Sequence, residues 1–317
     1  DYWIIAAASQ YECETINEVF LKAGMESREY AQRLYWNNWL STGANALHAI
    51  DKPYLELAKK SLMIIKAHSD KRGGVLASGD SSIFNYGRDY YCYCWPRDGA
   101  YAKWPLIRLG YTEEPKQFFE FCRDTLDRGG FLMHKYQPDR AIGSTWHPLV
   151  HENRKELAIQ EDETAIVIVM LGELYDYSKD KEFVLSLYTT LIQPTANFMA
   201  SYIDEETGLP HASYDLWEEK FLTNSYTCFV VEHALRRAAE FAEMFDYPDD
   251  AVTWKKASTL IHESAKLLFD PDRQAYRKGY YLQPDGSVKF DNTIDISSLY
   301  AALMFGAPIA GSAALAQ

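Results

Sequence analysis

Residues 160–171, with the sequence QEDETAIVIVML, decide the fold that this chain predicts. After Gln160 come three acidic side chains, which favour the N-terminus of a helix because they complement its dipole. It continues into an unbroken apolar run, residues 165–171, that has no polar face. A helix that is apolar all round must be buried. We therefore expect other helices to surround this one.

Similar helix starts recur along the chain at a regular spacing. They lie about 63, 63 and 72 residues apart, near Arg97, Gln160, Thr223 and Asp295, and each follows a long loop. Between them, a second and more amphipathic set is predicted to begin near residues 53, 115, 181 and 249. Such a period marks a repeat of helical hairpins. We expect an all-α fold in which an inner and an outer ring of helices form an α/α toroid.

The same pattern sets the expected extent of each element. Helices are predicted over residues 12–40 (one or two), 53–68, 98–109, 115–126, 161–177, 181–203, 224–245, 249–269 and 294–305, with a connecting loop at 41–51 and small hairpins at 130–136 and 280–282. Other strand signals are almost absent.

Residues 213–219, SYDLWEE, place three carboxyl groups around one indole. A carboxyl group against an aromatic wall is partly desolvated, which raises its pKa toward the range of a general acid. An indole also offers a flat apolar face on which a sugar ring can stack. The alternative is an amphipathic loop that packs its Trp into the core and leaves its acids in water. The residue types alone do not decide between these interpretations.

Polar and aromatic clusters precede all the predicted inner helices. They are WPRD (95–98), QEDE (160–163), WEE (217–219) and DNT (291–293). In a toroid the inner helices run in one direction, so these loops gather at one end of the barrel. Helix capping explains the acids and the Asn of any single cluster. It does not explain Trp95, Trp217 or the Arg97–Asp98 pair, so together the clusters predict a binding cleft.

Composition restricts the partners. The net charge of -13 argues against nucleic acid, which requires a basic face, whereas a neutral substrate suits an acidic cleft. No apolar run reaches the length of a membrane span. The five cysteines have no framework spacing, so they indicate free thiols and favour a cytoplasmic setting. Cys92-x-Cys94 lacks a partner pair at zinc spacing, so no metal site is expected.

Five segments carry a resemblance to a known family. They are residues 72–74 (RGG), 89–98 (DYYCYCWPRD), 144–148 (STWHP), 159–165 (IQEDETA) and 213–219 (SYDLWEE). In these segments the chain resembles the glucoamylase, glucodextranase and trehalase family of inverting glycoside hydrolases (glycoside hydrolase family 15), in its bacterial and archaeal form. The matching segments follow the family order from about residue 53 onward. The resemblance implies an (α/α)6 toroid and a hydrolase of α-glucosidic bonds.

The resemblance also implies roles for individual residues. Glu218 matches the general acid that protonates the glycosidic oxygen, and Glu219 matches a residue that binds the sugar on the leaving-group side. Arg97 and Asp98 match the pair that hydrogen-bonds the terminal glucose, which selects a non-reducing end.

Further residues follow from the same comparison. Trp95, Trp146 and Trp217 match the aromatic walls of the sugar site. Gln160 and Asp162 are expected to support the acid from the loop behind it. No cofactor is implied, because acid–base hydrolysis uses only carboxyl groups and water.

The chain departs from the family in its extent. Eight helices are predicted after the lead-in segment, where the toroid needs about twelve, so we expect an incomplete toroid over residues 52–317. Residues 1–51 are expected to be a helical lead-in from a β-sandwich domain that is not in this sequence. Two more hairpins would add on the order of 130 residues. The family's general base, a Glu near the end of the domain, would lie there. Glu161 and Glu163 are poor substitutes because they cap a helix.

The expected activity is exo-acting hydrolysis that releases glucose with inversion from maltooligosaccharides, other α-glucans or trehalose. Trehalase and glucodextranase activities remain open within the family. The alternative from another class is a carbohydrate-binding or regulatory toroid without turnover, which the absent base favours. The sequence does not indicate an oligomeric state.

Overall fold

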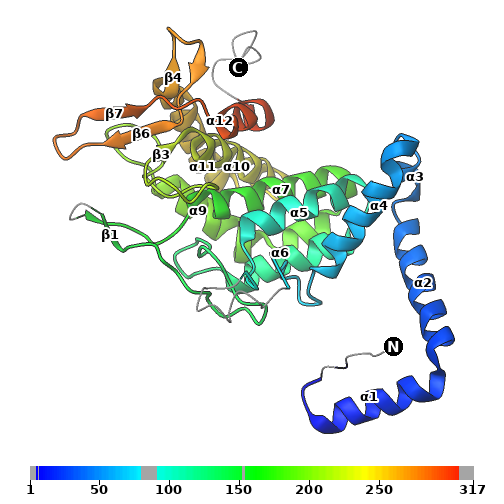
Figure 1. Cartoon of the computed structure of the whole chain (residues 1–317). Helices are drawn as coiled ribbons and strands as arrows, with labels where there is room; N and C mark the ends of the chain where they lie inside the picture. The colour runs from blue at the N-terminus through cyan, green and yellow to red at the C-terminus, as the bar shows by residue number, and fades with distance from the viewer. Residues whose placement is uncertain (1–4, 6, 80–90, 152–153, 307–317) are drawn as a thin grey trace. The chain divides into compact units, whose positions relative to one another are not determined.

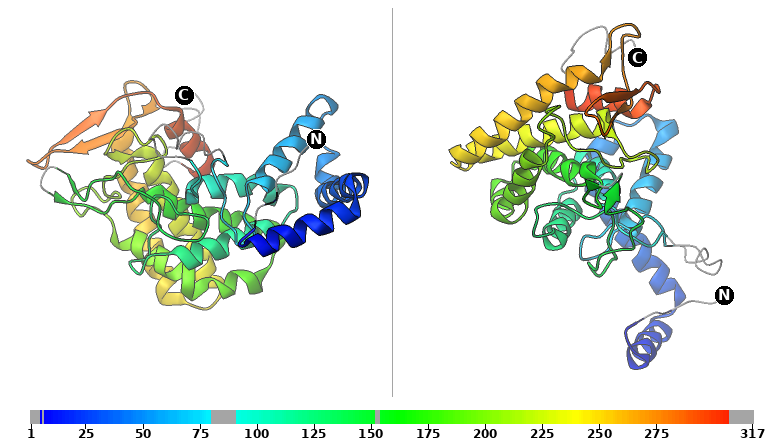
Figure 2. Two further views of the ribbon diagram at one scale, coloured as in Figure 1. Left: turned by 60° about the horizontal axis from the view of Figure 1, so that its bottom comes forward. Right: turned by 90° about the vertical axis from the view of Figure 1, so that its left-hand side faces the viewer.

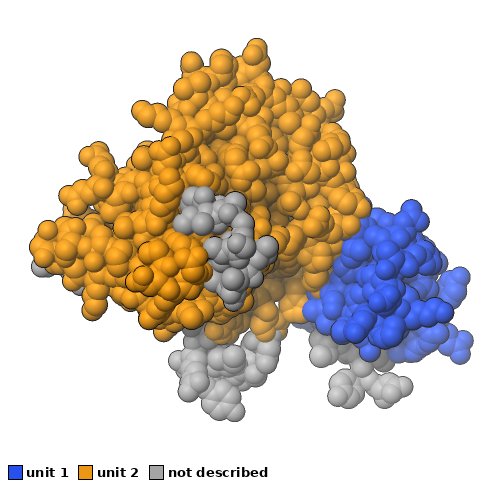
Figure 3. Space-filling model, turned by 90° about the horizontal axis from the view of Figure 1, so that it is seen from above, with its two compact units in different colours: residues 1–64, 109–111 blue, residues 65–108, 112–317 orange. Residues whose placement is uncertain are grey.

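The structure, a computed structural model, describes residues 5, 7–79, 91–151 and 154–306 (Figure 1). The first two residues of the 89–98 motif and the chain from residue 307 therefore lie outside the described residues. The chain divides into two compact units, coloured in Figure 3: residues 1–64 with 109–111, and residues 65–108 with 112–317.

The first unit is helical, as predicted for residues 12–40. Its helices are α1 (Gln10–Ala23), α2 (Met25–Ser41) and α3 (Ala44–Leu47). Gly24 separates α1 from α2 with a φ of 74°, a left-handed conformation that ends a helix at little cost only for glycine. The predicted loop at 41–51 contains the single turn α3, so that part of the prediction is wrong.

The helices of the second unit begin at the predicted regular spacing. Its helices are α5 (Pro96–Arg108), α6 (Glu113–Thr125), α7 (Glu161–Ser178), α8 (Lys181–Ser186), α9 (Gln193–Ser201), α10 (Ser225–Met244), α11 (Pro248–Ser264) and α12 (Ile296–Ala301), and α4 (Lys52–Ala67) runs into it from the first unit.

The helices of this unit form two layers. In Figure 1, α5, α7 and α10 lie side by side, and α12 packs on α10. Helices α6 and α11 pack on the outside of these, and both views of Figure 2 show α11 beside α10. Every residue from Glu161 to Gly172 is buried, whereas α11 buries a single face through Trp254 and Ile261. The predicted inner and outer helices are confirmed, and the fold class is that of the α/α toroids.

The predicted helix at 181–203 is interrupted. A π-helical turn, Tyr188–Ile192, separates α8 from α9. Pro194 lies in the first turn of α9 and has no N–H to donate to the preceding turn, so a regular α-helix cannot run through it.

Short strands join the loops at the N-terminal ends of the inner helices. They are β1 (Val150–His151), β2 (Arg154–Lys155), β3 (Thr223–Asn224), β4 (Phe269–Asp270), β5 (Ala275–Tyr276), β6 (Gly279–Leu282) and β7 (Val288–Asp291). The predicted hairpin at 280–282 is confirmed as antiparallel β6–β7. The hairpin predicted at 130–136 is wrong, because Tyr136 instead makes isolated bridges to Cys94 and Ile142.

Candidate active site

Arg97 organises the loops before α5 and α7. Its guanidinium donates hydrogen bonds to Oε1 of Gln160 (2.6 Å) and Oδ2 of Asp162 (2.9 Å), and it lies 3.4 Å from Oε1 of Glu163. Its backbone N–H donates to Oε2 of Glu163 (2.5 Å). Arg97 is only 6% exposed, so these contacts are made away from water, where charge-assisted bonds are strong. The two loops are therefore held in one geometry.

The first turn of α7 buries three carboxyl groups in succession. Burial raises the pKa of Glu161 well above its usual value. Burial also raises the pKa of Asp162 and of Glu163, although Arg97 partly opposes both shifts. A single guanidinium cannot neutralise all of these groups, so part of the cluster holds its protons at neutral pH.

Local sequence places Glu218 at the end of a tight turn. Oδ1 of Asp215 accepts from the N–H of Trp217 (2.9 Å), and the carbonyl of Asp215 accepts from the N–H of Glu218 (2.9 Å). This is an Asx turn followed by a β-turn. Glu218 has a φ of 52°, an uncommon conformation for a residue with a side chain and one that often marks a functional site. The turn directs its carboxyl group toward the Arg97 cluster.

Two further loops meet at the Glu218 carboxyl group. Its Oε1 lies 2.9 Å from Nε2 of His134 and 3.8 Å from Nη2 of Arg97. The structure thus brings together Arg97, Gln160, Asp162 and Glu218, which are up to 121 positions apart in the sequence. Their predicted roles stay predictions, but their proximity is what those roles require.

The pKa of Glu218 differs from the sequence-based expectation. Burial raises it, but the hydrogen bond and charge of His134, the Gln160 amide and the charge of Arg97 together lower the pKa of Glu218 to about 2. The predicted rise is therefore wrong for a state in which His134 is charged. The 213–219 pattern showed only the indole beside this carboxyl group, whereas His134 and Arg97 come from other segments of the chain.

Asp98 and Glu219 flank Glu218 with accessible carboxyl groups. The Asp98 side chain is 54% exposed and its Oδ2 lies 3.8 Å from Nε of Arg97. Burial of part of this group raises the pKa of Asp98, and Arg97 partly opposes the rise. The Glu219 side chain is 61% exposed and its Oε2 lies 3.3 Å from Nζ of Lys278. Both carboxyl groups can accept hydrogen bonds from a ligand.

The three predicted wall residues have different surroundings. Trp95 is buried and donates its indole N–H to Nε2 of His134 (3.0 Å). Trp146 is 47% exposed and stacks on the ring of His147 with centroids 4.2 Å apart. Trp217 is 46% exposed and donates to Oδ1 of Asp295 (3.0 Å). Trp146 and Trp217 thus have open surface for a ring, whereas Trp95 is buried against His134.

Two residues of the site were missed by the sequence reasoning. His134 lies within the predicted hairpin at 130–136, and the sequence indicates no role for it. Lys278 is 4% exposed and pairs with Oδ2 of Asp295 (3.0 Å) as well as with Glu219. It reaches the site because β3, directly after the Glu218 loop, pairs with β6, directly after Lys278. No spacing in the sequence signals either contact.

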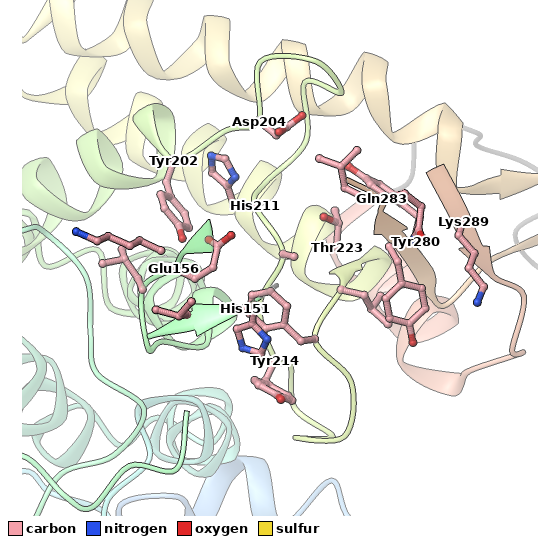
Figure 4. A pocket seen from close by; sticks show the side chains of 18 of the residues that line it. His151, Glu156, Tyr202, Asp204, His211, Tyr214, Thr223, Tyr280, Gln283 and Lys289 are labelled. Atoms are coloured by element: carbon pink, nitrogen blue, oxygen red, sulfur yellow. The ribbon is translucent and has the colours of Figure 1, made fainter. Parts of the chain in front are cut away.

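A cavity of about 1230 Å³ is lined by Tyr214 of the 213–219 loop, and none of the predicted site residues is among those that line it (Figure 4). It is lined by aromatic and polar side chains that include Tyr202, His211 and Tyr280. Tyr214 belongs to its wall and also packs on Trp146, with ring centroids 4.6 Å apart. The cavity and the Glu218 site therefore share one aromatic boundary.

Neither Glu161 nor Glu163 can replace the general base that inverting hydrolysis requires. Glu161 and Glu163 are both 0% exposed. Glu163 is also bonded to the backbone of Arg97. A general base must contact a water molecule beside the substrate, and these buried carboxyl groups cannot do so.

The structure has two layers of helices, with an arginine–carboxylate cluster and open indoles at the N-terminal ends of the inner layer. These features define the class of the α/α-toroid glycoside hydrolases. Comparison with known families gives the particular one. The family model described as glycosyl hydrolases family 15 matches residues 52–317, and the chain belongs to that family.

Several relatives are similar to this chain. It is 25% identical over 286 residues to an uncharacterized glycosyl hydrolase of Methanocaldococcus jannaschii, covering 88% of this chain and 42% of that protein. It is 23% identical over 293 residues to a trehalase of Mycolicibacterium smegmatis, covering 84% of this chain and 40% of that protein. The chain thus spans about two fifths of the length of these curated relatives.

Solved structures share the fold. A bacterial glucoamylase complexed with acarbose superposes with a TM-score of 0.58 at 19% identity, covering 78% of this chain and 36% of that one. A protein described as a wild-type glycosidase gives a TM-score of 0.62 at 18% identity, covering 84% of this chain and 70% of that one.

In the part of the chain that the structure describes, no helix is long and apolar enough to cross a membrane.

Proposed function

We propose that the protein to which this chain belongs hydrolyses α-glucosidic bonds at non-reducing ends and releases glucose with inversion, in the manner of a glucoamylase. The observation that supports this most is the position of Oε1 of Glu218, 3.8 Å from the Arg97 guanidinium. A sugar whose hydroxyl groups are bound by Arg97 and Asp98 places its own glycosidic oxygen beside Glu218. That ring is then the terminal one, which makes the reaction exo-acting.

In this reaction Glu218 donates its proton to the glycosidic oxygen as the bond from that oxygen to the anomeric carbon breaks. Arg97 and Asp98 hold the sugar while charge develops on its ring. Water attacks the opposite face, and a second carboxylate takes its proton. In inverting enzymes that carboxylate lies about 6.5–9.5 Å from the acid. We propose that it is supplied by residues outside the described part of the chain.

Glu219 and Lys278 are proposed to bind the leaving group. The Glu219 carboxylate is exposed, and Lys278 holds it at 3.3 Å. Trehalose, isomaltose and maltose differ only in how the second glucose is attached to the scissile oxygen, so this side of the site selects among them. Trehalose hydrolysis is the second candidate, because similar proteins include a trehalase. A binding protein without turnover is the alternative if no base completes the site.

The test measures glucose release by the full-length protein from maltose, isomaltose and trehalose. Proton NMR identifies the anomer that forms first. We expect β-glucose from at least one of the three, because inversion of an α-linkage gives the β-anomer. The control matched to Glu218→Gln is Glu263→Gln, which changes an exposed carboxyl group on α11 and should leave glucose release unchanged. If the glucose from the non-reducing end appears first as the α-anomer (for trehalose, two α-glucose and no β-glucose), or if none of the three substrates is hydrolysed, the proposal is refuted.

A further inference from the structure

We propose that Trp95 and His134 form a positioning pair that keeps the catalytic proton on Glu218. In this arrangement His134 is uncharged, and the single lone pair at Nε2 is shared by the Trp95 indole N–H and the protonated Glu218 carboxyl group in a three-centre hydrogen bond. The inference rests on the proposed role of Glu218 as the acid, and it assigns that role to a particular protonation state.

The geometry at Nε2 of His134 carries the argument. This atom lies 3.0 Å from the indole nitrogen of Trp95 and 2.9 Å from Oε1 of Glu218. An indole N–H can only donate a hydrogen bond. A proton on Nε2 would face that donor, so Nε2 presents its lone pair. The lone pairs of Nε2 and Oε1 would then repel at 2.9 Å unless Oε1 carries the proton.

The other nitrogen of His134 gives independent support. Nδ1 is buried and has no hydrogen-bond partner among the residues that the structure describes. His134 itself is 1% exposed. An imidazolium would therefore hold a charged N–H without an acceptor, which costs more than leaving a neutral N–H unpaired. The neutral ring is the cheaper state.

The charges around His134 come from several loops. Nζ of Lys135 lies 5.2 Å from the centre of the Trp95 indole ring, where a cation strengthens the indole as a donor. Arg97 adds a second cation beside Glu218. Glu218 itself and Asp98 favour a charged His134.

A neighbouring histidine adds no charge to this group. The rings of His134 and His147 have centroids 4.4 Å apart. Burial is the largest cause that lowers the pKa of His147 to about 4. Nε2 of His147 lies 3.2 Å from the Gln160 amide nitrogen, which only donates, and Nδ1 lies 3.2 Å from the Thr145 hydroxyl group. His147 is therefore neutral, with its proton on Nδ1.

The pair changes what the acid can do. A charged His134 pulls the pKa of Glu218 down, and a neutral one removes that pull and leaves burial to raise it. When the O–H bond of Glu218 breaks, its proton passes to the glycosidic oxygen, and His134 neither gains nor loses a proton. Water loses a proton to the second carboxylate, and exchange with solvent then returns a proton to Glu218.

The test reads the tautomer of His134 directly. Nitrogen-15 NMR of the 317-residue chain, labelled at histidine, distinguishes imidazolium from each neutral form, and His134→Asn assigns the signal by its loss. We expect a neutral ring protonated at Nδ1 between pH 5 and pH 8. Trp95→Phe should convert it to imidazolium, whereas the control Trp146→Phe, which removes an indole at 6.2 Å without a hydrogen bond to His134, should not. An imidazolium in the unaltered chain, or no change in Trp95→Phe, would overturn the proposal.

Two further measurements keep the outcome decidable. Where Trp95→Phe does not fold, Glu218→Gln replaces it: the Gln amide donates to Nε2, so His134 should keep its tautomer, and a shift of its proton to Nε2 would contradict the pair. In the full-length enzyme, Trp95→Phe should move the alkaline limb of the kcat/KM profile down by about one pH unit or more. The NMR result does not depend on turnover, so failure of the proposed function and failure of this pair are distinguishable.

Discussion

Replacing Arg97 by Gln removes the cation from a cluster of buried carboxyl groups. Asp162 and Glu163 are 0% exposed and within 3.4 Å of the guanidinium. Breaking a buried ion pair by removing one partner costs about 3–5 kcal/mol, since the other charge is left uncompensated. We expect the free energy of unfolding to fall by about this amount at pH 8.

The pH dependence of this loss is the sharper part of the prediction. Burial already raises the pKa of Asp162 and of Glu163 above their unfolded values, and removal of Arg97 raises both further. Groups with a raised pKa in the folded state stabilise it below the unfolded pKa and lose that contribution as pH rises through the folded pKa. Each carboxyl group that stays protonated only in the folded state lowers stability by about 1.4 kcal/mol per pH unit above pH 4. The variant should therefore be least stable at high pH.

The assay is urea unfolding followed by circular dichroism at pH 5 and pH 8. The control is Arg273→Gln, whose side chain is 54% exposed and whose loss should change stability by no more than about 0.5 kcal/mol. A loss for Arg97→Gln that is equal at both pH values would refute the reasoning. So would a loss no larger than that of the control.

Three further predictions concern Lys278, Gly73 and Asp215. Lys278→Met should free Glu219 and lower kcat/KM about tenfold through a higher KM, with partial recovery in Lys278→Arg, measured by steady-state kinetics of the full-length enzyme. Gly73→Ala should lower the melting temperature by several degrees, since a Cβ there would lie 1.9 Å from the carbonyl oxygen of Gln117 and the φ is 94°. Burial raises the pKa of Asp215 to about 6, so its ionisation destabilises the fold as pH rises above 4. The variant Asp215→Asn keeps the acceptor oxygen of the turn. In urea unfolding it should be more stable than the unaltered chain by about 1–3 kcal/mol at pH 8 and equally stable at pH 4.

The helical layers could be predicted because their signal is local. The spacing of helix starts and the apolar run at 165–171 each reflect contacts within one hairpin or between neighbours. The break at residues 188–192 could also have been anticipated, since Pro194 interrupts the backbone hydrogen bonds of any helix through it. The hairpin expected at 130–136 failed because Tyr136 pairs with Cys94, far away in the sequence.

The site could be predicted only in part. The family resemblance located Arg97 and Glu218, and the structure adds that they are neighbours. The contact of Glu218 with His134 joins residues 84 positions apart, and that with Trp95 runs through the same imidazole. Lys278 arrives through the register of β3 with β6, which no pattern within either segment specifies. Such contacts depend on tertiary structure, so composition and spacing cannot reveal them.

The claim that Glu218 is the proton donor is tested most directly by comparing two substrates of the full-length Glu218→Gln variant. Maltose has a leaving group that needs protonation, whereas the fluoride ion leaves α-glucosyl fluoride without it. We expect kcat to fall at least about a thousandfold on maltose and to stay within about tenfold of the unaltered enzyme on the fluoride. Equal losses on both substrates, or activity retained on maltose, would contradict the claim.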